Sequence, residues 1–299
     1  MNILVTGCAG FVGSHLVEEL QKKHNVIAFD NFSGGKEKNL EGLNVEIING
    51  DIRKISDLEN IKTKPDVIIH LAAIVDTTRY DSEMMDVNVK GTLNILEYAR
   101  RIGADIVNTS SAAIYGDKTA AIKESDSPDP QSLYAQSKLI AEKLAKAYHD
   151  NFNMNIVCLR LFNVYGPKEQ HKGKATSMVT KFLDSVLKGE DILIYGDGKQ
   201  RRDFIYVKDV AKAFALCAEK TKDIKWGIYN AGSGEAISFT DLVNLLKKLS
   251  GKDGNVTYSE NPLKVYQKFT MADITKIKEL GFEPIYSLEK GIKEYIESN

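Results

Sequence analysis

Tyr134 and Lys138 stand four residues apart in the helix-like stretch SLYAQSK, residues 132–138. Residues at positions i and i+4 share one face of a helix, so the phenol and the ammonium would lie together. A free phenol has a pKa of about 10 and is mostly protonated at neutral pH. A neighbouring ammonium stabilises the phenolate and brings its pKa toward the range of a useful general base. The pair therefore indicates either proton-transfer chemistry or an ordinary pair on an exposed helix face.

A glycine-rich stretch near the start of the chain has the residue types of a phosphate site. Gly7, Gly10 and Gly13 form GxxGxxG within ILVTGCAGFVGSHLVEEL, between a strand pattern and a helix pattern. Glycines permit a sharp turn and a close approach to a pyrophosphate, which then binds at the helix N-terminus. The flanking patterns favour dinucleotide binding over a turn that serves packing alone.

The second apolar strand ends in an acidic residue, Asp30, within VIAFDNFSGG. A carboxylate at this place accepts hydrogen bonds from an adenosine ribose and repels a 2′-phosphate, which favours NAD over NADP. Lys36 and Lys38 follow closely. Solvated loop lysines are the simpler interpretation of these two residues, but they leave NADP open.

Composition excludes several classes of function. The chain has 299 residues, 43% hydrophobic and 27% charged, with a formal net charge of −1 and no basic block typical of nucleic-acid binding. No apolar run approaches the roughly 20 residues of a membrane span, and the start lacks a signal-peptide pattern, so we expect a cytoplasmic protein. The cysteines and histidines lack metal-ligand spacing, which predicts no metal site and reduced thiols: Cys8, Cys158, Cys217, His15, His24, His70, His149 and His171.

Short apolar runs alternate with helical patterns through the first half of the chain. The predicted strands, all expected to be buried, are NILV, VIAF, VEII, DVIIH, DIVNTS and NIVCLRLF. Such alternation predicts an α/β fold with a doubly wound parallel sheet of the Rossmann type, covered by helices on both faces. After about residue 163 the pattern changes. We expect a dinucleotide-binding domain over residues 1–163, with a return segment near 203–220, and a smaller interleaved C-terminal α/β substrate lobe over 164–299.

The chain resembles extended short-chain dehydrogenases/reductases of the NAD-dependent nucleotide-sugar epimerase/dehydratase kind over nearly its whole length. The resemblance rests on ordered stretches: TGCAGFVGSH, Gly50–Asp51, HLAA at 70–73, Asn88 in DVNVKGT, SSAAIYGD at 110–117, YAQSK, RLFNVYGP at 160–167, RRDFIYVKDVA and NAGSGEAISFTDL. It implies an isomerase whose Rossmann domain keeps NAD throughout turnover and whose C-terminal lobe binds a nucleotide sugar. It also implies a homodimer formed through helices around 83–101 and 132–150, without nucleic acid or membrane as partner.

The resemblance assigns roles to single residues. Tyr134 is implied as the catalytic acid/base, Lys138 as the residue that binds the nicotinamide ribose and lowers the phenol pKa, and Ser111 as the hydroxyl that contacts the substrate oxygen and relays the proton. Taken alone, Ser111 could equally be a turn residue at a strand end. The implied cofactor-binding residues are Gly7, Gly10, Phe11, Val12, Gly13, Asp30, Asn31, Asp51, Ile52, Leu71, Ala72, Ala73, Asn88, Tyr134 and Lys138.

Two alanines after Ser111 bear on the type of reaction. The resemblance to 4,6-dehydratases and decarboxylating relatives would place an acidic residue directly after the catalytic Ser or Thr, but here Ala112 and Ala113 follow. Alanine cannot transfer a proton, so dehydration is disfavoured. The first hypothesis is a UDP-glucose 4-epimerase type, interconverting UDP-glucose and UDP-galactose through a transient 4-keto sugar and bound NADH.

Three stretches resemble a second type of epimerase, which acts at C6 of ADP-glycero-manno-heptose. They are TTRYDSEMMDVN at 77–88, NVYGPKEQHKG at 163–173 and YQKFTMAD at 266–273. In that family a lysine of the HKG stretch is a candidate second acid/base, and Lys172 stands at that place. A surface loop lysine or a phosphate contact are the alternatives for Lys172.

The resemblance also implies substrate-binding residues. Asn163 matches an asparagine that contacts substrate, Arg202 matches an arginine that binds the diphosphate, and Tyr195 could border the base. Thr270 falls near the position that limits bulk at C2 of the sugar, and a small residue there predicts tolerance of UDP-GlcNAc. Many 4-epimerases have a phosphate-binding arginine where this chain has Leu263, followed by Lys264, which leaves the nucleotide open.

Further hypotheses keep the same fold. A nucleotide-sugar reductase or dehydratase would share the cofactor site, and a reductase would release reduced cofactor. A non-catalytic nucleotide-sugar binder is also compatible with the fold, because fold does not fix function. The set of Ser111, Tyr134 and Lys138 argues against a pure binder, which has no need of the phenol.

Overall fold

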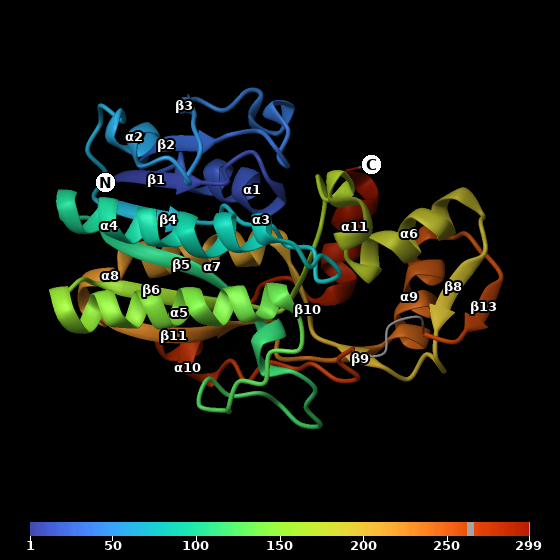
Figure 1. Ribbon diagram of the computed structural model, residues 1–299. Coiled ribbons are helices and arrows are strands. Elements are labelled where there is room, and N and C mark those ends of the chain that lie inside the picture. Colours follow the sequence, from blue (N-terminus) through green and yellow to red (C-terminus); the bar gives the residue numbers. More distant parts are fainter. Residues whose placement is uncertain (262–265, 299) are drawn as a thin grey trace.

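A seven-stranded parallel sheet forms the centre of the computed structural model, which describes residues 1–261 and 266–298 (Figure 1). The strand order is β11-β6-β5-β4-β1-β2-β3. Its strands are β1 Asn2–Thr6, β2 Asn25–Asp30, β3 Glu46–Asn49, β4 Val67–His70, β5 Asp105–Ser111, β6 Ile156–Leu161 and β11 Trp226–Ala231. The first six are the predicted strands, and the fold class is confirmed.

One predicted strand differs in its burial. The apolar run VEII was expected to be buried, but β3 is the edge strand of the sheet and Ile47 on it is 42% exposed. Because an edge strand has a neighbouring strand on one side only, its side chains can be less covered than those of the central strands and can remain in contact with water. That prediction was wrong for β3.

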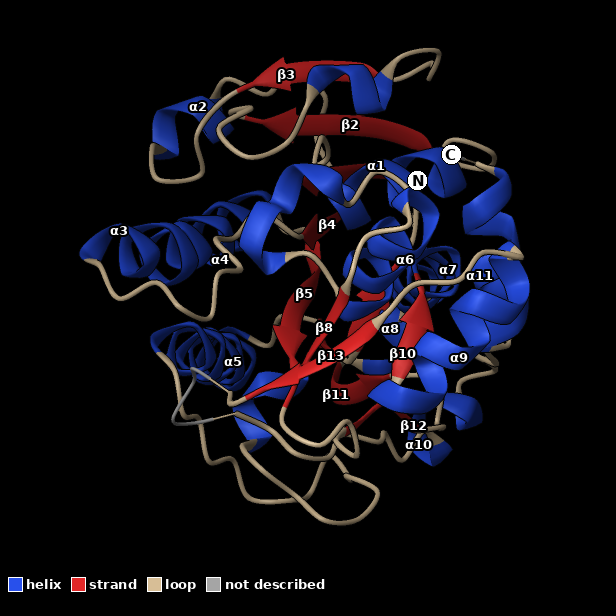
Figure 2. Cartoon of the chain, turned by 90° about the vertical axis from the view of Figure 1, so that its right-hand side faces the viewer, coloured by secondary structure: helices blue, strands red, loops and turns tan. Residues whose placement is uncertain are grey.

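Helices cover both faces of the sheet, as Figure 2 shows with α4 and α5 on one side and α7 on the other. The pair α1 and α7 packs into one core with the sheet, and α2, α4 and α5 form a second core with the opposite face. Their bounds are α1 Phe11–Leu20, α2 Ile55–Glu59, α4 Thr92–Ile102, α5 Leu133–Phe152 and α7 Val207–Glu219. Between β4 and α4 lie α3 Ser82–Met85 and the π-helix η2 Asp86–Gly91.

A second lobe forms around its own apolar core. It contains helices α6 Met178–Lys188, α9 Phe239–Ser250 and α11 Leu288–Glu297, with η4 Gln170–Ala175 leading into α6. Its short strand pairs are β7 Asn163–Tyr165 with β10 Phe204–Tyr206, β8 Ile192–Tyr195 with β13 Val256–Ser259, and β9 Arg201–Arg202 with β12 Ile237–Ser238. The lobe is therefore built from pieces of the second half of the chain.

The chain returns to the sheet between the pieces of the lobe. The predicted return segment near 203–220 contains α7, and the structure extends it through α8 Thr221–Ile224 to β11. The stretch WGIYNA pairs in parallel with β6 because its apolar residues can complete the sheet edge there. The elements η1 Glu37–Leu40, η3 Ala112–Tyr115 and α10 Thr275–Glu279 complete the described chain.

The described residues also show the state of the cysteines and whether a helix could cross a membrane. Cys8, Cys158 and Cys217 are all buried and free of disulfides. Within residues 1–261 and 266–298, no helix has the length and apolar character needed to cross a membrane.

Candidate active site

A cavity of about 880 Å³ opens at the carboxyl ends of the parallel strands, between the sheet and the second lobe. Residues that end or directly follow β1, β2, β4 and β5 line one side, and side chains of the lobe, including Met178 and Phe239, line the other. Open α/β sheets bind ligands at this edge, and the volume suits a large organic ligand. All predicted site residues except Asn88 and Thr270 line this cavity.

The glycine loop and the first turn of α1 line the cavity, and two of the glycines are packed too closely against backbone for a side chain. Gly7 has φ +72°, and a Cβ there would lie 2.7 Å from the backbone nitrogen of Ala72. A Cβ on Gly13 would lie 2.1 Å from the carbonyl oxygen of Gly7. Gly10, the N-cap, makes no side-chain cap, and the first turn of α1 holds no acidic residue. The free N–H groups of this turn therefore fit a diphosphate, as a dinucleotide cofactor requires.

Asp30 lies at the end of β2, next to the glycine loop. Its Oδ2 accepts a hydrogen bond from the Ala9 N–H at 2.9 Å, and its Oδ1 accepts one from the Phe32 N–H at 2.8 Å. A carboxylate has about four acceptor positions, so capacity remains for two ribose hydroxyls. Burial raises the pKa of Asp30, and the backbone donors oppose this shift. Its place and chemistry fit the adenosine ribose of NAD.

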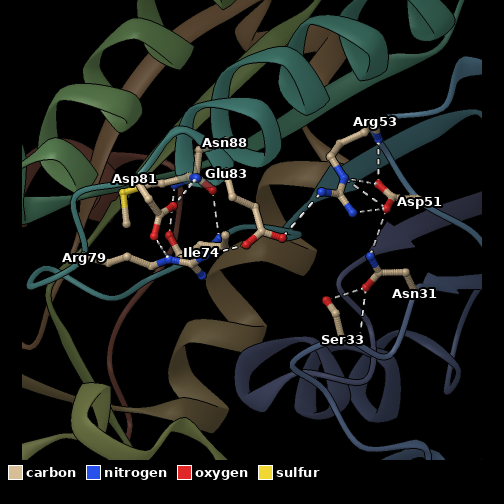
Figure 3. A network of polar contacts seen from close by, with 10 residues as sticks. Asn31, Ser33, Asp51, Arg53, Ile74, Arg79, Asp81, Glu83 and Asn88 are labelled. Atoms are coloured by element: carbon tan, nitrogen blue, oxygen red, sulfur yellow. Dashed lines mark hydrogen bonds and ion pairs between the residues drawn. The ribbon is translucent and has the colours of Figure 1, made fainter.

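A chain of polar contacts runs from this end of the cavity toward α3, as Figure 3 shows. Asn31 donates to Asp51 Oδ2 at 3.2 Å, and the Arg53 guanidinium donates to the same oxygen at 2.6 Å. Hydrogen bonds from Arg53 are the main cause that lowers the pKa of Asp51 to about 2. Arg53 also pairs with Glu83 at 3.5 Å, and Glu83 in turn pairs with Arg79. The turns after β2 and β3 are thereby connected to the segment that contains α3.

Asn88, predicted to bind the cofactor, hydrogen-bonds to the backbone of Ile74 and to Ser137. Its Oδ1 accepts from the Ile74 N–H at 2.8 Å, and its Nδ2 donates to the Ile74 carbonyl at 2.9 Å (Figure 3). The same Nδ2 also donates to Ser137 Oγ at 3.0 Å. The π-helix η2 carries Asn88, which is 2% exposed. Asn88 thus fixes the backbone of Ile74, which does line the cavity.

The three predicted catalytic residues all line the cavity. Tyr134 and Lys138 are on α5 and are only 8% and 6% exposed, so the interpretation as an exposed helix face is wrong. Ser111 ends β5. Burial raises the pKa of the Tyr134 phenol, and a hydrogen bond with Ser111 lowers it. Lys138 Nζ donates to the Thr109 carbonyl at 3.0 Å, and burial lowers the pKa of Lys138 to about 8.

Two hydroxyls beside Ser111 were missed from the sequence. Thr109 Oγ1 and Ser110 Oγ are buried and have no hydrogen-bond partner in the part of the chain that the structure describes. Both residues line the cavity. A buried hydroxyl without a partner is costly unless a ligand or water completes it, so these groups are candidate ligand contacts. The run of hydroxyl residues in NTSS at a strand end was the available signal.

On the substrate side, Asn163 and Arg202 line the cavity. Asn163 Nδ2 donates to the Asp203 carbonyl at 2.9 Å and to Thr270 Oγ1 at 3.1 Å. Thr270 is 1% exposed and lies behind Asn163, outside the cavity lining. The Arg202 guanidinium lies 5.5 Å from the Phe239 ring centroid, and burial lowers the pKa of Arg202 to about 10, which keeps it cationic at neutral pH. Tyr195, 38% exposed, completes this side.

Lys172 lies beside the glycine loop. Its Nζ is 2.9 Å from Glu169 Oε1 and 5.2 Å from the ring centroid of Phe11. Its side chain is 20% exposed and lines the cavity, which contradicts the alternative of a surface loop lysine. The acid/base and phosphate-contact alternatives both remain. Leu263 and Lys264 lie outside the described residues.

Comparisons with known proteins agree with this geometry. A model of the NAD dependent epimerase/dehydratase family matches residues 3–232. A UDP-glucose 4-epimerase from Thermotoga maritima, solved with UDP-glucose, is 33% identical with a TM-score of 0.92, covering 99% of this chain and 98% of that one. A UDP-N-acetylglucosamine 4-epimerase from Methanobrevibacter ruminantium, solved with UDP-N-acetylmuramic acid, is 32% identical with a TM-score of 0.93, covering 99% and 97%. An ADP-L-glycero-D-manno-heptose-6-epimerase from Helicobacter pylori is 37% identical with a TM-score of 0.88, covering 99% and 95%.

Proposed function

The chain belongs to the NAD-dependent epimerase/dehydratase family, and we propose that it is a UDP-hexose 4-epimerase of the UDP-glucose/UDP-galactose type that also accepts UDP-GlcNAc. As a member of that family it is an NAD-dependent isomerase of nucleotide sugars, and its cofactor is NAD. The sugar, the nucleotide and the carbon that is inverted belong to the proposal. The similarity to 4-epimerases over almost the entire chain supports this choice.

One observation carries the proposal. Ser111, Tyr134 and Lys138 meet in one cavity with the glycine loop, while the turn after Ser111 continues with Ala112 and Ala113. Ala112 is 5% exposed and packs into a small apolar cluster with Tyr115 and Phe162. Ser111, Tyr134 and Lys138 therefore supply the acid/base groups for oxidising a hydroxyl. The turn after Ser111 supplies no additional acid for eliminating water. Epimerisation requires only the first.

Each site residue has a distinct role in the proposed reaction. NAD, when bound, supplies a reversible hydride acceptor. Tyr134 takes the proton from the sugar hydroxyl and later returns it, Ser111 hydrogen-bonds the same oxygen, and Lys138 stabilises the phenolate by its charge. Arg202 offers a fixed set of N–H donors to the diphosphate of the nucleotide sugar. Asn163, held by Thr270, is placed to orient the sugar.

A second candidate is an ADP-glycero-manno-heptose 6-epimerase. It is favoured by Lys172, which lines the same cavity as Tyr134, and by the 37% identity to the heptose enzyme. The ion pair of Lys172 with Glu169 and its position over Phe11 place the ammonium next to the glycine loop. That position suits a diphosphate contact at least as well as a second acid/base, so the 4-epimerase is our first choice.

The test is direct observation of the sugar product. Purified protein with NAD⁺ is incubated with UDP-glucose, with UDP-GlcNAc and with ADP-D-glycero-D-manno-heptose, and the sugar protons are followed by NMR. We expect galacto-configured signals from both UDP sugars, with loss of at least about 10³-fold in rate for Tyr134→Phe, because the acid/base is removed. Tyr148→Phe, on the same helix but hydrogen-bonded to Glu97 at 3.3 Å, is the matched control and should retain activity.

The other outcomes are equally informative. Conversion of the heptose alone would move the assignment to C6 and make Lys172→Met the next variant to measure. Stoichiometric release of NADH would indicate a reductase. Binding of sugar nucleotide without conversion of any would contradict an enzymatic role.

We also propose a homodimer formed through the face of α4 and α5. These helices pack side by side over the sheet (Figure 1), and Leu93 and Phe152 on them are 39% and 51% exposed. Sedimentation velocity should give twice the mass of one chain, and Leu93→Asp should shift the species to monomer. A monomeric wild type at micromolar concentration contradicts the proposal.

A further inference from the structure

Glu142, one helical turn after Lys138 in α5, forms a buried ion pair with Arg160. The Arg160 guanidinium donates from Nε and from its NH2 nitrogen to the two carboxylate oxygens of Glu142, both at 2.8 Å. Each side chain is 4% exposed. Removing two charges from water is costly, and a hydrophobic pair of the same volume is often as stable, so stability alone does not account for this pair.

Glu142 shares a helix face with the catalytic residues. Tyr134, Lys138 and Glu142 follow one another at intervals of four residues in α5, and all three are buried. Residues at this spacing are stacked along one side of a helix. Burial lowers the pKa of Lys138, and the Glu142 carboxylate opposes this by attraction. Along α5, Glu142 therefore lies one turn from Lys138, on the side away from Tyr134, and its charge favours the ammonium.

The other groups that face Lys138 cannot replace this carboxylate. On β4, His70 is fully buried, and burial lowers its pKa to about 3, so it is neutral at neutral pH. On β5, the Thr109 carbonyl accepts a hydrogen bond from Lys138. On β6, the Cys158 thiol is kept protonated because burial raises its pKa. Of the described groups packed around Lys138, Glu142 is the anion.

Arg160 is itself held from a second side, which fixes the pair. Its NH1 nitrogen donates to the Tyr115 hydroxyl at 2.7 Å, and that hydroxyl donates to Asn230 Oδ1 at 2.7 Å. Tyr115 belongs to η3, the turn that begins after Ser111. Arg160 thus joins the helix with Tyr134 and Lys138 to the turn that follows Ser111.

We propose that Glu142 is a positioning residue of the active site: its carboxylate, anchored by Arg160, keeps the buried Lys138 side chain charged. The role rests on the proposed function, because proton transfer by Tyr134 requires the Lys138 ammonium. It does not depend on which sugar is the substrate. Glu142 does not line the cavity and acts through Lys138.

The test measures the titration of Lys138 directly in the purified protein with NAD bound. Lysine labelled with ¹³C at Cε is incorporated, and the Lys138 signal is identified by its loss in Lys138→Met. In Glu142→Gln we expect the midpoint of the Lys138 titration to fall by about one pH unit or more, since an attractive charge is removed. The basic limb of the pH dependence of kcat should shift by the same amount. An unchanged Lys138 midpoint in folded Glu142→Gln overturns the proposal.

Controls separate charge from packing and from folding. Glu97→Gln on α4 also removes a carboxylate paired with arginine, at 2.7 Å from Arg100, and should leave the Lys138 midpoint unchanged. Glu142→Asp keeps the negative charge, so its Lys138 midpoint should lie close to that of wild type. If Glu142→Gln does not fold, the double variant Glu142→Gln/Arg160→Met leaves no unpaired charge, and its midpoint must also fall below that of wild type for the proposal to stand. The titration requires no turnover, so a shifted midpoint in a protein that converts no sugar would refute the proposed function alone.

Discussion

At the residue scale, Asp51 illustrates how a charge contact becomes a dependence of stability on pH. Its carboxylate accepts from the Arg53 backbone N–H at 2.9 Å and from the Arg53 guanidinium, and its pKa falls to about 2 in the folded protein. A carboxylate whose pKa is lowered on folding stabilises the folded state above its unfolded pKa, near 3.8, and loses this contribution as the pH falls toward 2.

The first prediction concerns Asp51→Asn. At pH 7 the variant should lose about 1 kcal/mol of unfolding free energy, a modest value because the Arg53 side chain is 34% exposed and the pair is screened by water. Urea titrations between pH 7 and pH 3 should show the difference from wild type shrinking as the pH falls. Asp150→Asn, at an exposed pair with Lys146, is the control and should change stability by less than about 0.5 kcal/mol. A difference that is constant with pH would exclude the ion pair as its source.

At the element scale, the start of α1 depends on backbone positions that no side chain can occupy. The second prediction is that Gly13→Ala disrupts NAD binding, because its Cβ would lie 2.1 Å from the Gly7 carbonyl oxygen. Gly34→Ala is the matched control, since Gly34 also lines the cavity and its Cβ would meet nothing within 4 Å. Equilibrium dialysis with NAD⁺ should show at least about tenfold weaker binding for the first variant only, a cost of about 1.4 kcal/mol or more. Equal affinities would mean that the loop does not hold the diphosphate.

The elements that the sequence predicted correctly are those with strong local signals. β1, β2, β4 and β6 contain continuous apolar runs, and β5 begins with a short one before its polar end. The pair of Tyr134 and Lys138 lies on the helix that their spacing indicated. β11 was not predicted as a sheet strand because its run WGIYNA joins a partner 70 residues earlier, at β6. Such pairing depends on the tertiary fold, which local periodicity does not encode.

The site residues also divide into those with a local sequence signal and those whose position depends on tertiary packing. The glycine loop and Asp30 have fixed spacing from a strand, so the sequence located them. Cofactor binding by Asn88 stays a prediction, and the structure adds its hydrogen bonds to the Ile74 backbone, which spacing did not predict. Thr270 was placed at the sugar, yet it lies behind Asn163. Whether a side chain faces the cavity or the protein interior depends on tertiary packing, which the spacing of residues in the sequence does not predict.

At the scale of the whole molecule, residues 266–273 connect the two parts that enclose the cavity. On the side of the sheet, Gln267 Nε2 donates to the Gly116 carbonyl at 2.7 Å, and the Ile122 N–H donates to the Met271 carbonyl at 2.8 Å. On the side of the lobe, the Thr270 N–H donates to the Arg201 carbonyl at 3.1 Å. Movement of this segment would therefore change both walls of the cavity together.

Asp203 is the anchor of this connection. Its side chain is fully buried and accepts hydrogen bonds from the N–H groups of Ser233, Gly234 and Ala272, at 2.7, 3.0 and 2.9 Å, and from the Ser233 hydroxyl at 2.7 Å. The last prediction is that Asp203→Asn lowers the unfolding free energy by about 3 kcal/mol, because the amide nitrogen would face N–H donors and leave them unsatisfied. Asp197→Asn, whose side chain is 68% exposed, should change it by less than about 0.5 kcal/mol.

Two probes decide whether Asp203 acts on the whole molecule or on the lobe alone. Trp226, the single tryptophan of the chain, lies in β11 of the sheet and reports that part by fluorescence, whereas far-UV circular dichroism reports helices of both parts. If residues 266–273 couple the two parts, both guanidinium transitions of Asp203→Asn should move together to lower concentration. A shift of the circular dichroism transition with an unchanged tryptophan transition would mean that the lobe unfolds by itself and that residues 266–273 do not couple the two parts.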